Sequence, residues 1–232
     1  MIEMARRLIR QKFGSRGLVV ALAVLALMET FGVAHRGVGD GFTIATWGIF
    51  ILAAGSVSRD VGSGALQMIL ARPIRRTQYL FGRYFGILAA FAIFLFVTSL
   101  LAFAGVRLAM PSLAADVSPG RLAALAGTTF LSGAFPAAIL LFFSTFLPGI
   151  ADLLGLLMLN LVLHLPASAG SAFARISETA RENLLPDVDW SEALGGSGPA
   201  LAAAGRWVFA LTVYLALAAV VFSRRELPYG ND

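Results

Sequence analysis

Long apolar segments with few charged residues constrain most strongly what this chain can fold into. A bilayer core of about 30 Å is crossed by roughly 20 apolar residues in a helix. Six segments approach that length: about 17–35, 41–57, 86–106, 121–146, 150–166 and 200–222. Only 13% of the 232 residues are charged, against about 25% in soluble domains. The sequence therefore predicts an all-α membrane protein with six transmembrane helices in a single transmembrane domain over 1–232.

The first residues predict a helix that lies in the headgroup layer. Its apolar side chains share one helical face and its cations the other, which is typical of interfacial helices. The apolar positions are Ile2, Ala5, Leu8, Ile9 and Phe13. A basic, frayed terminus is the alternative. We expect no cleavable signal peptide, because no small-residue cleavage site closes the first apolar segment.

The positions of the basic residues predict the orientation in the membrane. Most of the 18 Lys and Arg residues lie in the N-terminal segment, in the insert 58–85 and after the last apolar segment. Since basic residues are retained on the cytoplasmic side, we expect both termini and the insert to be cytosolic. The net charge of +5 then reflects topology and contact with membrane lipid, and it does not indicate a nucleic-acid partner.

Several kinds of chemistry are excluded by composition. The chain has no cysteine, so disulfides, thiolate metal sites and thiol catalysis are absent. Its one lysine, Lys12, is followed by Phe13, so there is no phosphate-binding GxxxxGK[ST] loop. His35 and His164 belong to no HExxH motif. We expect no catalytic residue, metal or cofactor on this chain.

The insert 58–85 is the charged, amphipathic part of the chain. Gly62-Ser63-Gly64 predicts a break, and the next residues predict a short helix over 65–71. Leu66, Ile69 and Leu70 form a stripe on that helix. The helix must end before Pro73, which disfavours helix at the preceding residue. An ordinary re-entry loop with snorkelling arginines is the alternative.

The order of residue types in this insert resembles a motif of ABC type-2 transporter permeases. The residues that carry the resemblance are Asp60, Gly64, Leu66, Ile69, Leu70, Pro73, Ile74, Arg76, Tyr79, Gly82 and Arg83. The chain departs from the motif where Asp60 replaces the usual Glu and where Ala65 replaces the usual Thr. The six-segment layout, the interfacial N-terminal helix and the long loop before the last segment extend the resemblance over the whole chain.

The resemblance implies the permease half of an ATP-driven transporter, mostly an exporter, in the plasma (inner) membrane of a bacterium or archaeon. A separate ABC ATPase subunit would bind ATP and Mg²⁺, and a second permease copy would complete a homodimer or heterodimer. The insert would supply a short cytosolic coupling helix that contacts the ATPase. The residues implied in this coupling are Arg59, Asp60, Gly64, Leu66, Ile69, Leu70, Pro73 and Arg76.

The outer loop 167–199 predicts short helices before the last span. Phe173, Ile176, Ala180 and Leu184 recur at helical spacing, and Asp189 is placed to cap a second short helix. The loop is either a lid over an outward exit or a plain interfacial connector.

Two acids fall within apolar segments, where ionisable groups usually face a bundle interior or a cavity. We expect Glu29 to line a translocation path or to pair with Arg36, and Asp152 to line the path or cap the fifth span. Pro136 is expected to kink the fourth span and to lie on the path.

Two alternative functions remain. The first is a subunit of a cytochrome c maturation system, because haem-exporter B subunits share the size, the number of spans and a similar acid-Gly-Leu pattern. The second, an intramembrane hydrolase, rests on Ser132-Gly133 and His164, but Phe130 stands where rhomboid proteases have the glycine of GxSG. No residue cluster identifies a substrate.

Overall fold

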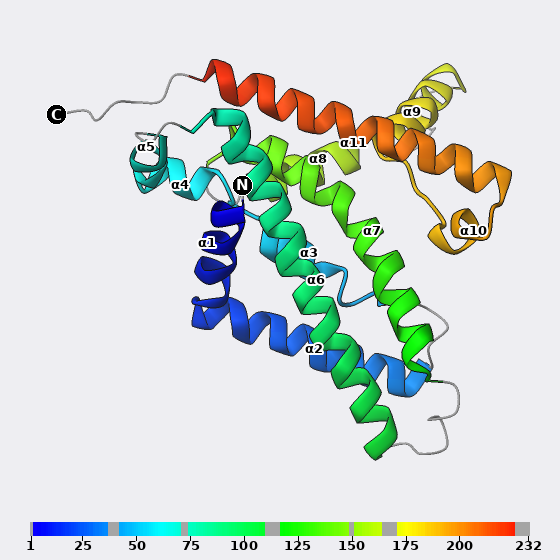
Figure 1. Ribbon diagram of the computed structural model, residues 1–232. Coiled ribbons are helices and arrows are strands. Elements are labelled where there is room, and N and C mark those ends of the chain that lie inside the picture. Colours follow the sequence, from blue (N-terminus) through cyan, green and yellow to red (C-terminus); the bar gives the residue numbers. More distant parts are fainter. Residues whose placement is uncertain are drawn as a thin grey trace. The chain divides into compact units, whose positions relative to one another are not determined.

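The computed structural model describes residues 2–36, 42–70, 74–109, 117–148, 151–163 and 171–225, and within these ranges every regular element is a helix (Figure 1). The helices are α1 (Ile2–Phe13), α2 (Arg16–Arg36), α3 (Trp47–Ala53), α4 (Ser58–Gly62), α5 (Ala65–Leu70), α6 (Arg76–Ala109), α7 (Pro119–Ser144), α8 (Ala151–Leu163), α9 (Ser171–Leu184), α10 (Trp190–Leu194) and α11 (Gly198–Arg224). The chain divides into two compact units. The first unit is Met1–Ala53 with Phe81–Ala137, and the second is Ala54–Leu80 with Ala138–Asp232.

Four of the described helices are long and apolar enough to cross a membrane, as expected of a membrane protein. Their apolar stretches are Arg16–His35, Arg76–Leu108, Pro119–Ser144 and Gly198–Arg224. They coincide with the first, third, fourth and sixth predicted spans. The prediction of an α-helical membrane protein is confirmed at this level.

The other two predicted spans contain only short helices. In the segment 41–57, α3 has 7 residues and is flanked by turns at 43–46 and 54–57. In the segment 150–166, α8 has 13 residues, and residues 164–166 lie outside the described part of the chain. The prediction of one continuous helix over 41–57 is wrong. Gly55 helps to end α3 because its φ of 63° lies in the left-handed region, which only glycine adopts without strain.

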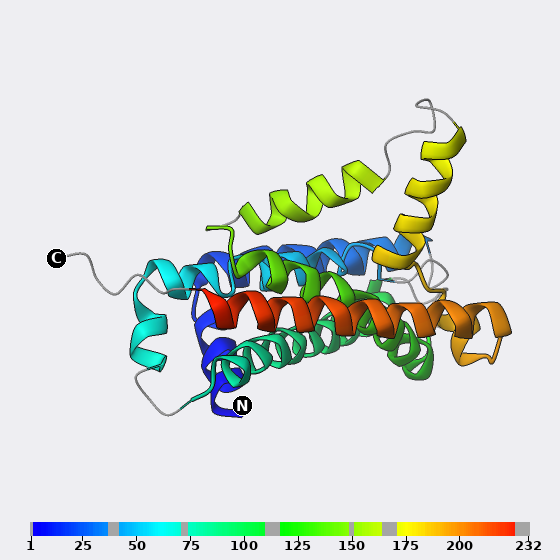
Figure 2. The same ribbon diagram turned by 90° about the horizontal axis from the view of Figure 1, so that it is seen from above.

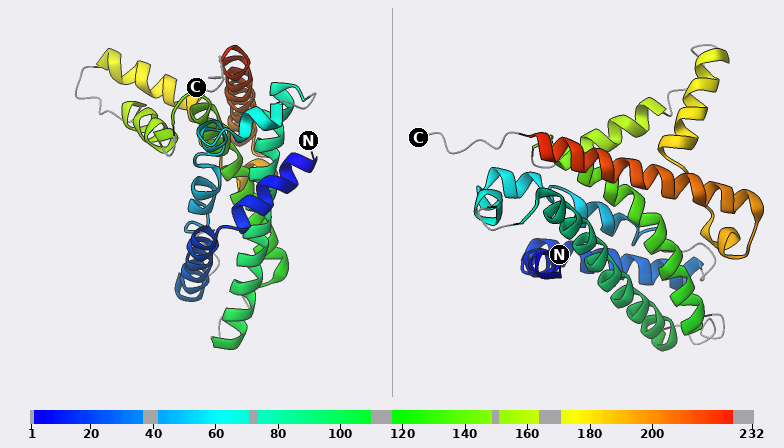
Figure 3. Two further views of the ribbon diagram at one scale, coloured as in Figure 1. Left: turned by 90° about the vertical axis from the view of Figure 1, so that its left-hand side faces the viewer. Right: turned by 45° about the horizontal axis from the view of Figure 1, so that its top comes forward.

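The first unit begins with α1, which meets α2 at a sharp bend (Figure 3). Gly14 permits this bend, since a Cβ there would lie 2.7 Å from the carbonyl oxygen of Arg10. Leu8 of α1 is fully buried, as its apolar position predicts. The sequence placed Lys12 on the opposite, cationic face, but its side chain is also buried. The cationic face of α1 is therefore narrower than the residue pattern suggests.

The pairing of α6 with α7 forms a further part of the first unit's core. The hydroxyl of Tyr84 donates a hydrogen bond of 3.1 Å to the carbonyl oxygen of Ala134. The rings of Phe91 and Phe130 stack with their centroids 6.4 Å apart. Gly133 allows this close approach, because a Cβ at that position would lie 2.5 Å from Cε1 of Phe91. Small residues at such crossings let membrane helices pack closely.

The second unit is arranged along α11. Figures 1 and 2 show α4 and α5 near the C-terminal end of α11, and α9 and α10 near its N-terminal end. The segment 167–199 contains the short helices α9 and α10, as its residue spacing predicted, although residues 167–170 lie outside the described ranges. Asp189 caps α10 as expected, accepting hydrogen bonds from the amides of Ser191 and Glu192. The Ser191 side-chain hydrogen bond is the main cause of the lowered pKa of Asp189.

Candidate functional site

The candidate site is the elbow formed by α4 and α5. The two helices are joined through Gly64, whose φ of 70° requires a residue that tolerates the left-handed region. The predicted break is confirmed at residues 63–64, and the helix that follows it is present, whereas Gly62 belongs to α4, which was not predicted. Residues 71–73, which include Pro73, lie outside the described part of the chain.

Asp60 attaches the elbow to the first turn of α6. Its side chain is buried, and Oδ2 accepts a hydrogen bond of 2.6 Å from the hydroxyl of Tyr79. The Tyr79 ring stacks on Phe222 near the end of α11, with the centroids 5.7 Å apart. A hydrogen bond to a buried carboxylate is stronger than one between neutral groups. The motif acid therefore holds the elbow in place from inside the unit.

Arg76 caps the C-terminal end of α11 with its side chain. Its Nη1 donates to the carbonyl oxygens of Phe222, Ser223 and Arg225, at 3.4, 3.0 and 2.7 Å. The last carbonyls of a helix lack partners within it and attract cations. Arg225 in turn donates to the carbonyl oxygen of Thr145, just beyond the end of α7.

These contacts form what we call the elbow frame, defined as Asp60, Arg76, Tyr79, Phe222 and Arg225. The frame connects α4 to the start of α6 and connects α6 to the ends of α11 and α7. Packed, hydrogen-bonded groups transmit a displacement, because protein interiors have few voids to absorb it. A displacement of α4 would therefore be transmitted to the ends of three long helices, α6, α7 and α11.

The exposed surface of the elbow is smaller than the predicted apolar stripe suggests. Leu66 is buried in the unit, and Ile69 is half-buried. The backbone of Leu70 belongs to α5, but its side chain lies outside what the structure describes. Arg59 is exposed on α4. Among the predicted coupling residues with a described side chain, Arg59 is the one best placed to meet a partner.

The second predicted site, Glu29 and Pro136, lies in the first unit. Glu29 is fully buried, and its Oε2 accepts a hydrogen bond of 2.6 Å from the amide of Ala45, in the turn before α3. Helix α7 continues through Pro136 from residue 119 to residue 144. That Glu29 and Pro136 line a translocation path stays a prediction.

In the second unit, side chains of α7 and α8 likewise accept hydrogen bonds from backbone amides in the turn after α3. Oδ2 of Asp152 accepts from the amide of Gly55 at 2.7 Å. Oγ of Ser144 accepts from the amides of Val57 and Ser58 at 3.0 and 3.1 Å. Asp152 also bonds within its own helix, where Oδ1 accepts from the amide of Leu153 at 3.0 Å.

Glu29 and Asp152 thus share one chemical task. A buried backbone amide outside a helix needs a hydrogen-bond partner from elsewhere in the protein, because leaving it unpaired is costly. Sequence reasoning missed Ser144 and the pairing of these acids with the segment 41–57. The signal that could have indicated it is the combination of a glycine in one apolar segment with acids in two others.

Comparison of the sequence with known proteins does not assign it to a family. No protein-family model matches the sequence, and no curated protein shows significant similarity to it. Among the described residues, no group of three or more His, Asp or Glu side chains is placed to hold a metal ion. Ser132 is exposed on α7, and His164 lies outside the described ranges.

Proposed function

We propose that this chain is the transmembrane permease subunit of a type-2 ATP-binding cassette transporter, with the elbow of α4 and α5 as the contact for a separate ATPase subunit. The elbow frame is the observation that carries the proposal. A coupling element must be joined rigidly to the helices that it moves, and Asp60, Arg76 and Tyr79 join this elbow to helix ends. The residue pattern of the insert supplies the link to this class of transporter.

The proposal includes six membrane crossings with both termini in the cytosol. The second crossing would be the interrupted segment that contains α3, and the fifth would contain α8. The elbow lies near one end of α11, and α9 and α10 lie near its other end (Figure 2). This arrangement favours a cytosolic elbow and an external loop. The membrane would be the plasma (inner) membrane of a bacterium or archaeon.

The proposed assembly contains this chain, a second permease copy and ATPase subunits that bind ATP and Mg²⁺. Export is the proposed direction of transport. Energy would enter when closure of the ATPase displaces α4 and α5. The frame would then shift the ends of α6, α7 and α11, which is how a local contact can change a packed bundle.

Reversing the charge of Arg59 tests the proposed contact. The full chain is purified in mild detergent from native membranes, and the co-purified P-loop ATPase and its ATP hydrolysis are measured. We expect Arg59→Glu to reduce recovery of the ATPase about tenfold, because loss of an interface charge and the repulsion that replaces it cost about 1.4 kcal/mol or more.

Arg75→Glu is the matched control, since Arg75 is an exposed arginine in the same insert but lies outside the elbow. It should leave recovery of the ATPase unchanged. Absence of a P-loop ATPase from the wild-type preparation would refute the proposed function. Equal losses in the two variants would refute the assignment of the contact to the elbow.

A further inference from the structure

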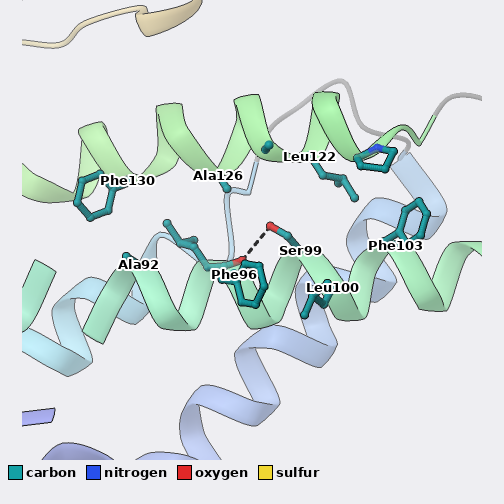
Figure 4. A pocket seen from close by; sticks show the side chains of 11 residues that line it. Ala92, Phe96, Ser99, Leu100, Phe103, Leu122, Ala126 and Phe130 are labelled. Carbon is teal, nitrogen blue, oxygen red and sulfur yellow. Dashed lines mark hydrogen bonds between the residues drawn. The ribbon is translucent and has the colours of Figure 1, made fainter. Parts of the chain in front are cut away.

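A groove of about 510 Å³ lies between α6 and α7 in the first unit (Figure 4). It is lined from α6 by side chains between Ala92 and Phe103, and from α7 by side chains between Pro119 and Phe130. Its volume is within the range of small-molecule sites. Ser99 is the one polar side chain in this lining, and its Oγ donates to the carbonyl oxygen of Leu95 at 2.8 Å. The groove therefore suits an apolar occupant.

The groove is open along α6. Phe96 and Leu100 line it and are 64% and 52% exposed. Because both helices are apolar enough to cross a membrane, the surroundings of this opening are the bilayer. An acyl chain can enter sideways from the lipid without crossing water.

The depth of the groove matches one leaflet. No charged residue occurs in α6 between Arg83 and Arg107, a length of about 36 Å at about 1.5 Å per residue. This is close to the thickness of the hydrocarbon core, about 30 Å, so Arg107 lies at one boundary of the core. The groove extends over about 16 Å of helix from Ala92 to Phe103, toward Arg107.

Arg107 places a positive charge at the end of the groove. Its guanidinium carbon lies 4.8 Å from the centroid of the Phe103 ring, which is part of the lining. Arg107 is exposed and lies in the last turn of α6. An arginine at headgroup depth is a bidentate donor for phosphate oxygens.

We propose that this groove binds one acyl chain of an anionic phospholipid, whose phosphate contacts Arg107. The apolar lining suits the acyl chain, the length of the groove corresponds to about one leaflet, and the positive charge of Arg107 suits the phosphate of the headgroup. A zwitterionic lipid would fill the groove without gaining the full attraction of Arg107. A second copy of this chain would fill it without needing the charge.

The first test measures lipid preference with the full chain in mixed micelles. Phosphatidylglycerol and phosphatidylcholine with identical acyl chains are offered at equal concentration, and the bound lipids are counted by native mass spectrometry. The wild type should retain phosphatidylglycerol in preference to phosphatidylcholine. Arg107→Gln should weaken that preference about fivefold, since a basic residue near the membrane surface contributes about 1 kcal/mol toward anionic lipid.

Arg121→Gln is the matched control for charge. Arg121 is exposed near the same end of the helix pair, but at about 100° per residue it lies on the face of α7 away from the lining positions. It should keep the wild-type preference. An equal loss in Arg107→Gln and Arg121→Gln, or no preference in the wild type, overturns the proposed headgroup site.

A second pair of variants tests the groove itself. Ala126→Trp fills the groove and should reduce tightly bound lipid of both kinds, whereas Ala124→Trp, on the same helix outside the lining, should not. Unchanged lipid counts in Ala126→Trp overturn the proposal. Conversion of a dimer to a monomer by Ala126→Trp, with no change in bound lipid, would overturn it in favour of a second copy as the occupant.

Discussion

Replacing Asp152 by alanine is expected to lower the free energy of unfolding by about 3 kcal/mol, because a buried amide loses a charged acceptor. Oδ2 of Asp152 accepts from the amide of Gly55 at 2.7 Å, and both residues are buried. An amide buried in the protein does not regain its partner from solvent, so the full cost of leaving it unpaired remains. Asp152→Asn keeps one acceptor oxygen and should lose less than Asp152→Ala. Unfolding of the full chain in detergent micelles, followed by circular dichroism, measures both changes.

Asp187→Ala is the control, since Asp187 is an exposed acid in the loop before α10. It should leave unfolding unchanged. Hydrogen exchange provides a second measurement, in which the amide of Gly55 should exchange faster in Asp152→Ala than in the wild type. If Asp152→Ala behaves like Asp187→Ala in both measurements, the carboxylate does not stabilise the interruption after α3.

The parts of the fold that depend on local signals could be predicted from the sequence. Four long apolar segments form helices of spanning length, and the number of consecutive apolar residues is enough to predict this. The break at Gly64 and the cap at Asp189 were also accessible, since each needs only a few neighbouring residues. The same holds for the short helices α5, α9 and α10.

The interruption around α3 was not predicted, because its hydrogen-bond partners are distant in the chain. Gly55 and Asp152 are separated by 97 positions, and Val57 and Ser144 by 87. The apolar character of 41–57 is the same for a continuous and a broken helix. Hydropathy therefore could not distinguish the two backbones.

The elbow shows the same limit at the candidate site. The motif residues Asp60 and Arg76 were predicted from one segment, whereas their partners are Tyr79 and the last carbonyls of α11. No periodicity links residue 76 to residue 225. A pattern in the insert can thus indicate a class of protein, whereas the reason for an acid and an arginine in that pattern emerges only from the folded contacts.

The contact of α6 with α7 leads to the second large prediction. A Cβ on Gly133 would lie 2.5 Å from Cε1 of Phe91, whose ring is fully buried. We expect Gly133→Ala to lower the free energy of unfolding by about 2 kcal/mol, in the range for overpacked cores. Gly127→Ala on the same helix meets nothing within 4 Å and should be neutral or stabilising by up to about 1 kcal/mol. Unfolding in detergent compares the two, and equal stabilities would show that Phe91 moves aside without cost.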